Sequence, residues 1–558
     1  MRVLWIVALL LSCAASVTAQ LEQARTLLRQ GKPEEALQLL HPLVSRGDEA
    51  ALLLAGDIWM ELERPDSALS LYNRIPKATA KPAVVWRIGS ALTALGKPTE
   101  AIPLLRKARE QHPRDIEIAL ALARSLLQAD SLQKAEQVAL QAREFAGADA
   151  RLYTFIGDLY YRQRVYELAR QNYEQALQID SLQSQARIRL AEVYFRMAQR
   201  EQDRELANEY YRRSLLNWDI VTRQDSTNAR AFYEKGRLFF FARQYRGAAE
   251  ALSRYVQLRP SGSLGRWLLA QALVELRQCD SALPHLERVA QELDTARPQA
   301  LLLRARCFFE MDRYGEARRA YDELLRSPSA PADAADWERA GVSALFTGDT
   351  AAAIEYFRGS LEREPQRCAL SFRLGTLLYG RRQYVDAIAI FRQRLQHCPD
   401  TLTPRVYAFI GTAFLAANQP DSALPALTES LRLDSTNLFA HRLLVASLMA
   451  LRRYAEAETA TWRALRYAQQ HNDQQSADDI VASLCAPWLE AKDFSRLQRL
   501  AREATRLAPF SAKAWVFLGL AYHGLNDATN ACRAYREALR RNPAETTAQQ
   551  NLKLLNCP

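Results

Sequence analysis

The sequence predicts an all-α solenoid of about fifteen helix-turn-helix units that ends in a C-terminal capping helix. The first observation is a repeat of about 34 residues that runs from near the start of the chain to Pro543. The second is a small residue at a fixed place in each period, such as Gly519, where two helices of a unit would cross closely. The third is another small residue twelve positions later, such as Ala531, where the second helix would pack back.

Both small places recur in phase along the chain, and prolines close several of the units. The first place is filled by Gly56, Gly89, Ala123, Gly157, Ala191, Gly236, Ala270, Ala305, Gly341, Gly375, Gly411, Cys485 and Gly519. The second is filled by Ala36, Ala68, Ala101, Ala135, Ala169, Ala248, Ala282, Ala317, Ala353, Ala387, Ala423, Ala457 and Ala531.

The turns between helices have the expected chemistry. Gly31-Lys32-Pro33 and Gly96-Lys97-Pro98 lie between paired helices, and Asp66 and Asp421 are predicted N-caps of second helices. Acidic segments between units, such as Asp225–Asn228, resemble metal loops superficially. They lack the acidic spacing of a calcium loop, so the sequence favours helix caps and predicts no metal site.

The repeat predicts one continuous solenoid over residues 20–545, with three soft joints near residues 200–208, 327–335 and 469–479. The first joint is a charged stretch expected to lengthen both helices of the sixth unit. The other two loosen the chain before the tenth and fourteenth units. Residues 546–558 are predicted to form the capping helix and tail that shield the last unit from water.

The copy at Ala512–Glu545 carries a nearly complete family pattern, W-x2-L-G-x2-Y…A-x3-F…P. This copy resembles the tetratricopeptide repeat (TPR) family, and the resemblance covers nearly the whole chain after residue 19. It implies a right-handed α-α superhelix whose first helices line a concave groove that holds a protein or peptide partner. The residues that match the pattern are Trp515, Leu518, Gly519, Tyr522, Ala531, Tyr535, Ala538 and Pro543.

Residues 1–19 differ from the repeats and resemble a secretory signal peptide. Arg2 precedes the apolar run Val3–Leu11, and Val17-Thr18-Ala19 is a small-residue cleavage site before Gln20. An alternative takes Leu11-Ser12-Cys13 as a lipoprotein box with a lipid on Cys13, although the preceding apolar run is short for that. The sequence thus predicts export to the periplasm or outside a bacterial cell, with a lipid-anchored outer-membrane form as the alternative.

The cysteines suit an oxidising compartment, and their places within the repeat suggest pairs. Cys368 and Cys398 should lie at the same end of one hairpin, Cys532 and Cys557 would pin the cap, and Cys279 and Cys307 could bridge adjacent units. Cys485 occupies a buried small place and would remain a core thiol. The alternative is that all seven cysteines after the leader are reduced.

The net charge of +11 arises mainly from arginine. Residues 151–300 carry 23 basic and 18 acidic side chains, and the family register places aromatic and cationic residues on the groove-facing helices there. Such a surface suits extended peptides, carboxylates or sugars. The predicted groove residues are Arg151, Phe155, Tyr161, Arg162, Arg189, Phe195, Arg196, Arg230, Tyr233, Arg237, Phe240, Trp267, Arg306 and Phe309.

The sequence offers no support for catalysis, for a cofactor or for nucleic-acid binding. The two Gly-Lys pairs are turns followed by proline, not phosphate-binding loops, and the seven histidines lack the spacing of a metal-binding helix. No motif of a nucleic-acid-binding module is present. The paired asparagines with which some TPR modules grip a chaperone C-terminus are also missing from consecutive first helices.

Two functional hypotheses remain. The first is a non-catalytic scaffold in the bacterial cell envelope that holds a protein or peptide partner in its groove. The second is a structural spacer or assembly subunit of an envelope secretion or polysaccharide-export system, in association with membrane complexes. The fold alone does not choose between them, because one scaffold serves unrelated ligands.

Overall fold

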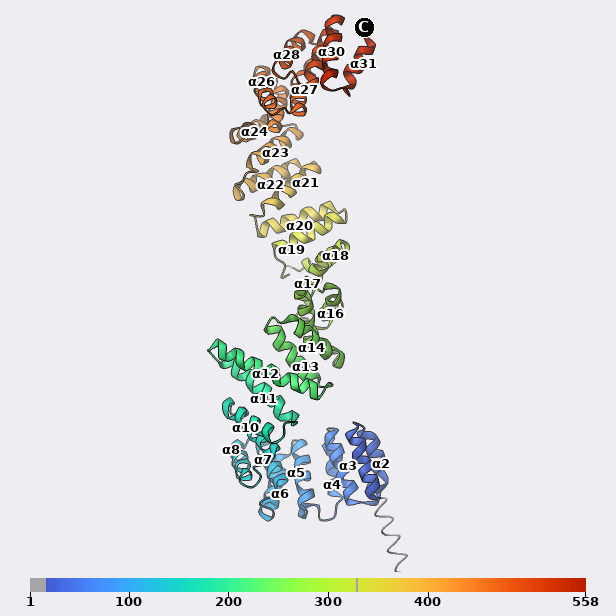
Figure 1. Ribbon diagram of the computed structural model, residues 1–558, viewed down its shortest axis with the longest axis vertical. Helices are drawn as coiled ribbons and strands as arrows, with labels where there is room; N and C mark the ends of the chain where they lie inside the picture. The colour runs from blue at the N-terminus through green and yellow to red at the C-terminus, as the bar shows by residue number, and fades with distance from the viewer. Residues whose placement is uncertain (1–16, 328–329, 558) are drawn as a thin grey trace, which may run out of the picture. The chain divides into compact units, whose positions relative to one another are not determined.

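The computed structural model describes residues 17–327 and 330–557, and every regular element in those ranges is helical. The chain divides into two compact units, one ending at Leu276 and the other beginning at Arg277. Each unit is a succession of antiparallel helical hairpins (Figure 1). This confirms the predicted all-α solenoid of helix pairs.

The first unit begins with a helix over residues 17–29, which includes the three residues of the predicted cleavage site. The rest of the predicted leader lies outside the described residues. The further helices are α2 (Pro33–Arg46), α3 (Glu49–Glu61), α4 (Pro65–Asn73), η1 (Ala78–Ala80), α5 (Pro82–Ala94), α6 (Pro98–Gln111), α7 (Ile116–Gln128), α8 (Leu132–Arg143), α9 (Ala150–Arg162), α10 (Tyr166–Ile179), α11 (Ser184–Arg200), α12 (Arg204–Gln224), α13 (Ala229–Phe241), α14 (Tyr245–Leu258) and α15 (Ser263–Glu275).

The second unit begins with α16, which packs against α17, and ends with a single helix after the last hairpin. Its helices are α16 (Cys279–Glu292), α17 (Arg297–Glu310), α18 (Tyr314–Leu325), α19 (Ala334–Phe346), α20 (Thr350–Arg363), α21 (Cys368–Gly380), α22 (Tyr384–His397), α23 (Thr403–Ala416), α24 (Pro420–Leu433), α25 (Leu438–Ala450), α26 (Tyr454–Gln470), α27 (Gln474–Glu490), α28 (Phe494–Leu507), α29 (Ala512–Gly524), α30 (Ala528–Arg541) and α31 (Thr546–Leu554).

The first small place of the repeat is where the two helices of a hairpin cross, as the sequence predicts. A Cβ atom built on Gly519 in α29 would lie 2.6 Å from the ring of Tyr535 in α30. Gly375 in α21 meets the ring of Phe391 in α22 in the same way. A large side chain on the second helix therefore fills the space that glycine leaves on the first.

Most turns within hairpins contain one residue in the left-handed region, but the turn 201–203 between α11 and α12 does not. Gly31, Gly96 and Gly348 adopt it, but most hairpins place a non-glycine residue there, such as Arg164 with φ 64° or Arg382 with φ 61°. Only a minority of these turns are therefore recognisable from a glycine in the sequence.

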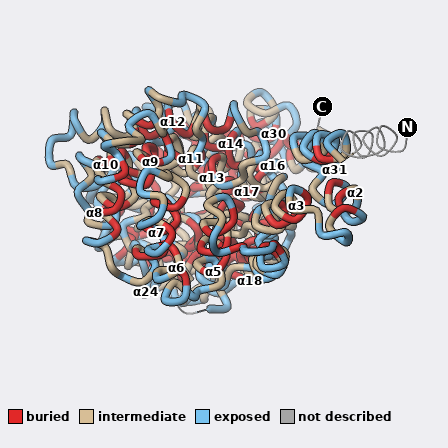
Figure 2. Tube along the Cα trace, turned by 90° about the horizontal axis from the view of Figure 1, so that it is seen from below, coloured by how far each residue is buried: buried red, intermediate tan, exposed pale blue. Residues whose placement is uncertain are grey.

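The core runs as a thin layer between the paired helices. The alanines of the second small place are fully buried wherever they occur from Ala36 to Ala531. Buried and exposed stretches alternate along the helices in Figure 2. In the described part of the chain, no helix is both long and apolar enough to cross a membrane.

The places where the rhythm changes have distinct local structures. Helices α11 and α12 are 17 and 21 residues long and are joined by the short turn 201–203. Near residue 470, α26 and α27 each have 17 residues. Residues 328–329 lie outside the described residues. Whether these places act as soft joints stays a prediction.

The last helix, α31, packs against α29 and α30. Its Ala548 is fully buried beside Val516 and Tyr535, whereas its other side chains are partly or fully exposed. This arrangement covers the apolar face of the last hairpin and leaves a polar outer surface.

Candidate functional site

Some consecutive first helices, such as α5 and α7, contact one another in addition to their own hairpin partners. In the first unit, arginine–carboxylate pairs join α3 to α5, α7 to α9, α9 to α11 and α11 to α13. These pairs are partly exposed, so each contributes little to stability. Together they neutralise charge on the exposed side of the successive first helices, here called the first-helix face. Three of the predicted groove arginines are held in this way. The pairs are Arg87–Asp57 at 2.7 Å, Arg151–Glu117 at 2.7 Å, Arg189–Asp158 at 3.2 Å and Arg230–Glu192.

Asp158 shows how this face is tied to the core. The buried Tyr173 hydroxyl donates a hydrogen bond of 2.7 Å to Asp158, and Arg189 from the next first helix pairs with the same carboxylate. Burial raises the pKa of Asp158 in spite of these partners. A structural role accounts for this perturbed carboxylate, because Tyr72, Asp57 and Arg87 repeat the arrangement.

Arg237 and two aromatic rings form a surface of the first unit that combines a cation with aromatic ring faces. The Arg237 guanidinium carbon lies 4.8 Å from the centre of the Phe195 ring and 6.0 Å from that of Tyr233. Glu234 pairs with Arg237 at 2.6 Å. All four side chains are half-buried, so the rings and the guanidinium are held in place while part of each remains accessible.

Phe155 is a predicted groove residue that the structure places elsewhere. Its side chain is only 5% exposed and packs in the core with Leu152 and Ile156. The helix face that carries Phe155 turns inward, toward the neighbouring hairpin, so an aromatic residue there contributes to folding and not to a surface.

The remaining predicted residues of the first unit are accessible. Tyr161, Arg162 and Arg196 line one cavity at the ends of α9 and α11. Phe240 packs edge-on to Tyr245 with ring centres 5.8 Å apart, and Trp267 is half-buried on α15.

Two predicted groove residues belong to the second unit. Arg306 donates two hydrogen bonds, of 2.8 and 2.7 Å, to the fully buried Asp336, which also pairs with Arg339 at 2.9 Å. Phe309 packs edge-on to Tyr314, with ring centres 5.6 Å apart. Arg306 therefore holds α17 to α19 and has little freedom to bind a ligand.

An aromatic run that was not predicted from the sequence lies on the first helices α21, α23 and α25. The ring centres of Phe372 and Phe409 are 5.2 Å apart, and Phe439 continues the run 5.9 Å from Phe409. Arg405 lies over both Phe372 and Phe409 and helps line a cavity of about 470 Å³. The same first-helix register that selected the groove residues from Arg151 to Phe309 would have found these residues in later hairpins.

The structure joins the cysteines in the same three pairs that the sequence suggests. The Cα atoms are 5.2 Å apart for Cys279 and Cys307 and 5.7 Å apart for the other two pairs, within the usual range for a disulfide. Cys485 is a buried free thiol, and burial raises its pKa. The oxidation state in solution stays a prediction.

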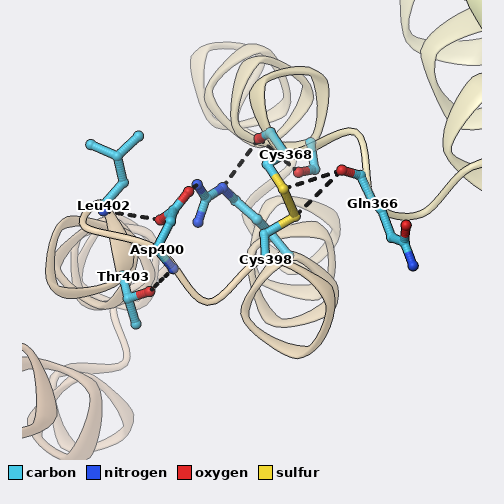
Figure 3. The surroundings of a disulfide bond; sticks show 8 residues. Gln366, Cys368, Cys398, Asp400, Leu402 and Thr403 are labelled. Carbon is cyan, nitrogen blue, oxygen red and sulfur yellow. Dashed lines mark hydrogen bonds and ion pairs between the residues drawn. A yellow bond between two sulfur atoms is a disulfide. The ribbon is translucent and has the colours of Figure 1, made fainter.

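The Cys368–Cys398 bond lies beside a buried cation (Figure 3). Arg394 is only 1% exposed, donates a hydrogen bond of 3.2 Å to the carbonyl of Cys368 and pairs with Asp400 at 2.6 Å. The Cys368 hairpin thus has a covalent and an ionic connection at the same end.

Residues 17–327 and 330–557 contain no group of three or more His, Cys, Asp or Glu side chains placed to hold a metal ion. His441 is buried, its Nε2 lies 2.9 Å from the carbonyl oxygen of Ser435, and burial lowers its pKa. A backbone contact of this kind is structural.

Family models for the tetratricopeptide repeat match six stretches, from the first unit to the last hairpin. They are residues 21–82, 92–159, 150–181, 268–335, 338–400 and 512–545. No curated protein shows significant similarity to this sequence.

Many solved structures resemble the chain at low identity. A chain of the APC/C hetero-tetramer Cut9–Hcn1 is 16% identical over 91% of this chain and 96% of its own, with a TM-score of 0.29. The C-terminal part of a TPR protein from Cytophaga hutchinsonii is 17% identical over 51% of this chain and 98% of its own, with a TM-score of 0.30. YrrB, a TPR protein with an unusual peptide-binding site, is 16% identical over 42% of this chain and 100% of its own, with a TM-score of 0.25.

TM-scores of this size support no statement about what the chain binds. The repeat models, the helical hairpins and the close crossings at Gly375 and Gly519 agree with one another. The chain belongs to the tetratricopeptide repeat family.

Proposed function

We propose that this protein is a non-catalytic scaffold of the bacterial cell envelope that holds a protein or peptide partner on the first-helix face of its first unit. The export step rests on the leader-like residues 1–19, and the three cysteine pairs suit an oxidising compartment. The repeat family supports protein interaction as the general role.

The observation that carries the proposal is the arrangement of Arg237 with Phe195 and Tyr233. Both rings are half-buried and come from consecutive first helices, α11 and α13. Aromatic and arginine side chains that are held in place lose little entropy on binding and dominate many protein interfaces. An extended peptide can use the ring faces for its apolar side chains and the guanidinium for its carbonyl oxygens.

The second candidate is a structural spacer or an assembly subunit of an envelope secretion or polysaccharide-export system. The ion pairs between first helices favour it, because Arg151, Arg189 and Arg230 are already neutralised. A spacer needs a regular stack of hairpins and no accessible binding face.

A double substitution, Trp267→Ala with Arg237→Ala, separates the two candidates. The scaffold hypothesis expects loss of partner capture from native envelope extracts with unchanged helicity by circular dichroism. The spacer hypothesis expects no effect of this variant, but loss of function when one whole hairpin, residues 438–473, is deleted.

Arg246→Ala is the matched control for the arginine substitution. Arg246 lies on the second helix α14, and its side chain is 90% exposed. It should leave partner capture unchanged. Equal losses with Arg246→Ala and with the Trp267 and Arg237 double variant would argue against a first-helix binding face.

A further inference from the structure

Four arginines of the first unit converge on one cavity without carboxylate partners. Arg162, Arg164, Arg196 and Arg200, here called the arginine pocket, line a cavity of about 480 Å³ together with Tyr161, Tyr166 and Gln199. Among the described residues, none of the four forms an ion pair with an acidic side chain. The pocket thus differs from Arg151, Arg189 and Arg230, which pair with carboxylates.

Two hairpins position these side chains. Arg162 is the last residue of α9, Arg164 lies in the following turn, and Tyr166 begins α10. Arg196 and Arg200 lie one turn apart at the end of α11. The pocket is therefore formed where the ends of two successive first helices meet the turn of the first hairpin.

The tyrosines contact two of the four cations without neutralising them. The Arg200 guanidinium lies 4.6 Å from the centre of the Tyr166 ring, and the Tyr161 and Tyr166 rings are 5.6 Å apart. A hydrogen bond to Tyr161 raises the pKa of Arg196. Arg196 also donates to Gln199 at 3.1 Å, which leaves further donors of its guanidinium available.

No acidic side chain in residues 17–327 and 330–557 forms an ion pair with the four arginines of the pocket. Two like charges 4 Å apart repel by about 1 kcal/mol even in water. The acidic side chain that acts on Arg196 is Glu192, which is already bonded to Arg189 and Arg230. Attraction to helix dipoles explains a cation at the end of α9 or α11, but not the convergence of four on one cavity.

We propose that the arginine pocket binds the carboxylates of an acidic segment of the partner peptide, an inference that rests on the proposed function. Guanidinium groups bind carboxylates with two parallel hydrogen bonds, and four of them suit two or more neighbouring Asp or Glu side chains. The tyrosine rings offer apolar contact for the methylene groups. The pocket adjoins the proposed binding face, because Arg196 follows Phe195 on α11.

Fluorescence anisotropy with the full chain and a labelled peptide of alternating Asp and Glu tests the proposal. The probe should bind in a salt-dependent manner, and a peptide of Asn and Gln should not. Arg196→Gln with Arg200→Gln should weaken binding at least about tenfold, because each charge-assisted contact is strong. Arg162→Gln with Arg164→Gln should also weaken binding of the acidic peptide. This second variant leaves α11 unchanged.

The matched control is Arg212→Gln with Arg246→Gln, which removes the same charge from exposed positions on second helices. It should retain binding. Equal weakening by the control pair, or absence of binding to the parent chain, overturns the proposal. The proposal is also overturned if a sulfated polysaccharide binds through Arg196 and Arg200 and the acidic peptide does not, because the pocket would then be a sulfate site.

Failure of this inference is distinguishable from failure of the proposed function. If partner capture is lost with Trp267→Ala and Arg237→Ala but retained with Arg196→Gln and Arg200→Gln, the scaffold stands and the acidic-segment inference is wrong. If both variants retain the partner, the binding face itself is wrong.

Discussion

At the residue scale, the small residues determine where the two helices of a hairpin can cross closely. Gly375 has no side chain because the ring of Phe391 occupies the space where a Cβ atom would lie. The core is close-packed, so an added side chain must displace a helix and not a flexible group. The sequence predicts these positions because their spacing repeats.

Gly375→Leu should lower the free energy of unfolding of its hairpin by about 1–3 kcal/mol through overpacking. Gly380→Leu is the control, since a Cβ there meets nothing within 4 Å. Hydrogen exchange of α21 and α22 measures the effect locally, which suits a repeat protein whose unfolding is not all-or-none. Unchanged exchange in the Gly375 variant would show that the helices do not cross there.

The buried Asp336 should make the free energy of unfolding depend on pH. Burial alone would raise the pKa of this carboxyl, but hydrogen bonds from Arg306 and the nearby Arg339 charge lower it below the ordinary value of 3.8. A depressed pKa stabilises the folded state above pH 3.8, and this stabilisation is lost as the pH falls through the folded-state pKa.

The free energy of unfolding should therefore differ most between parent and Asp336→Asn at neutral pH. The difference should shrink as the pH falls below 3.8. Urea denaturation at several pH values measures it. A difference that stays constant with pH would mean that the Arg306 pair contributes nothing ionic to stability.

At the element scale, the helical hairpin is the unit that the sequence predicts best. Helix pairs and the capping helix follow from the repeat. The predicted N-caps Asp66 and Asp421 instead lie in the first turns of α4 and α24, because these helices begin earlier, at Pro65 and Pro420. The left-handed residues in turns such as Arg164 and Arg382 were not predictable, because residues other than glycine occupy them. Phe155 was assigned to a surface because the family register does not tell which aromatic residues a neighbouring hairpin covers.

The disulfide of the Cys368 hairpin closes a loop with a sequence separation of 30 residues. In the loop-entropy model such a cross-link stabilises by about 3–4 kcal/mol, so Cys368→Ser with Cys398→Ser should raise hydrogen exchange throughout α21 and α22. Helices of the first unit should be unaffected, because stability is local in a solenoid.

Alkylation of the denatured protein after export checks the oxidation state. Without reductant only Cys485 should label, and with reductant all seven cysteines beyond the leader should do so. Labelling of seven thiols in the unreduced protein would contradict the three disulfides.

At the scale of the whole molecule, the repeat predicts architecture more fully than function. The contacts of Arg189, Arg230 and Arg306 are with carboxylates from other hairpins, and such partners depend on three-dimensional register that a single sequence does not reveal. The arginine pocket could not be predicted from the sequence, because the sequence does not show which arginines have carboxylate partners.

Photo-crosslinking from the first-helix face tests the central claim most directly. A photoreactive phenylalanine analogue at Trp267 in α15 is compared with the same analogue at the exposed Glu250 in α14, in cells that make the full chain. The scaffold account predicts a discrete protein adduct from position 267 that Arg237→Ala removes, and none from position 250. Adducts of equal yield from both positions, or none from either, would contradict a partner-binding face on the first helices.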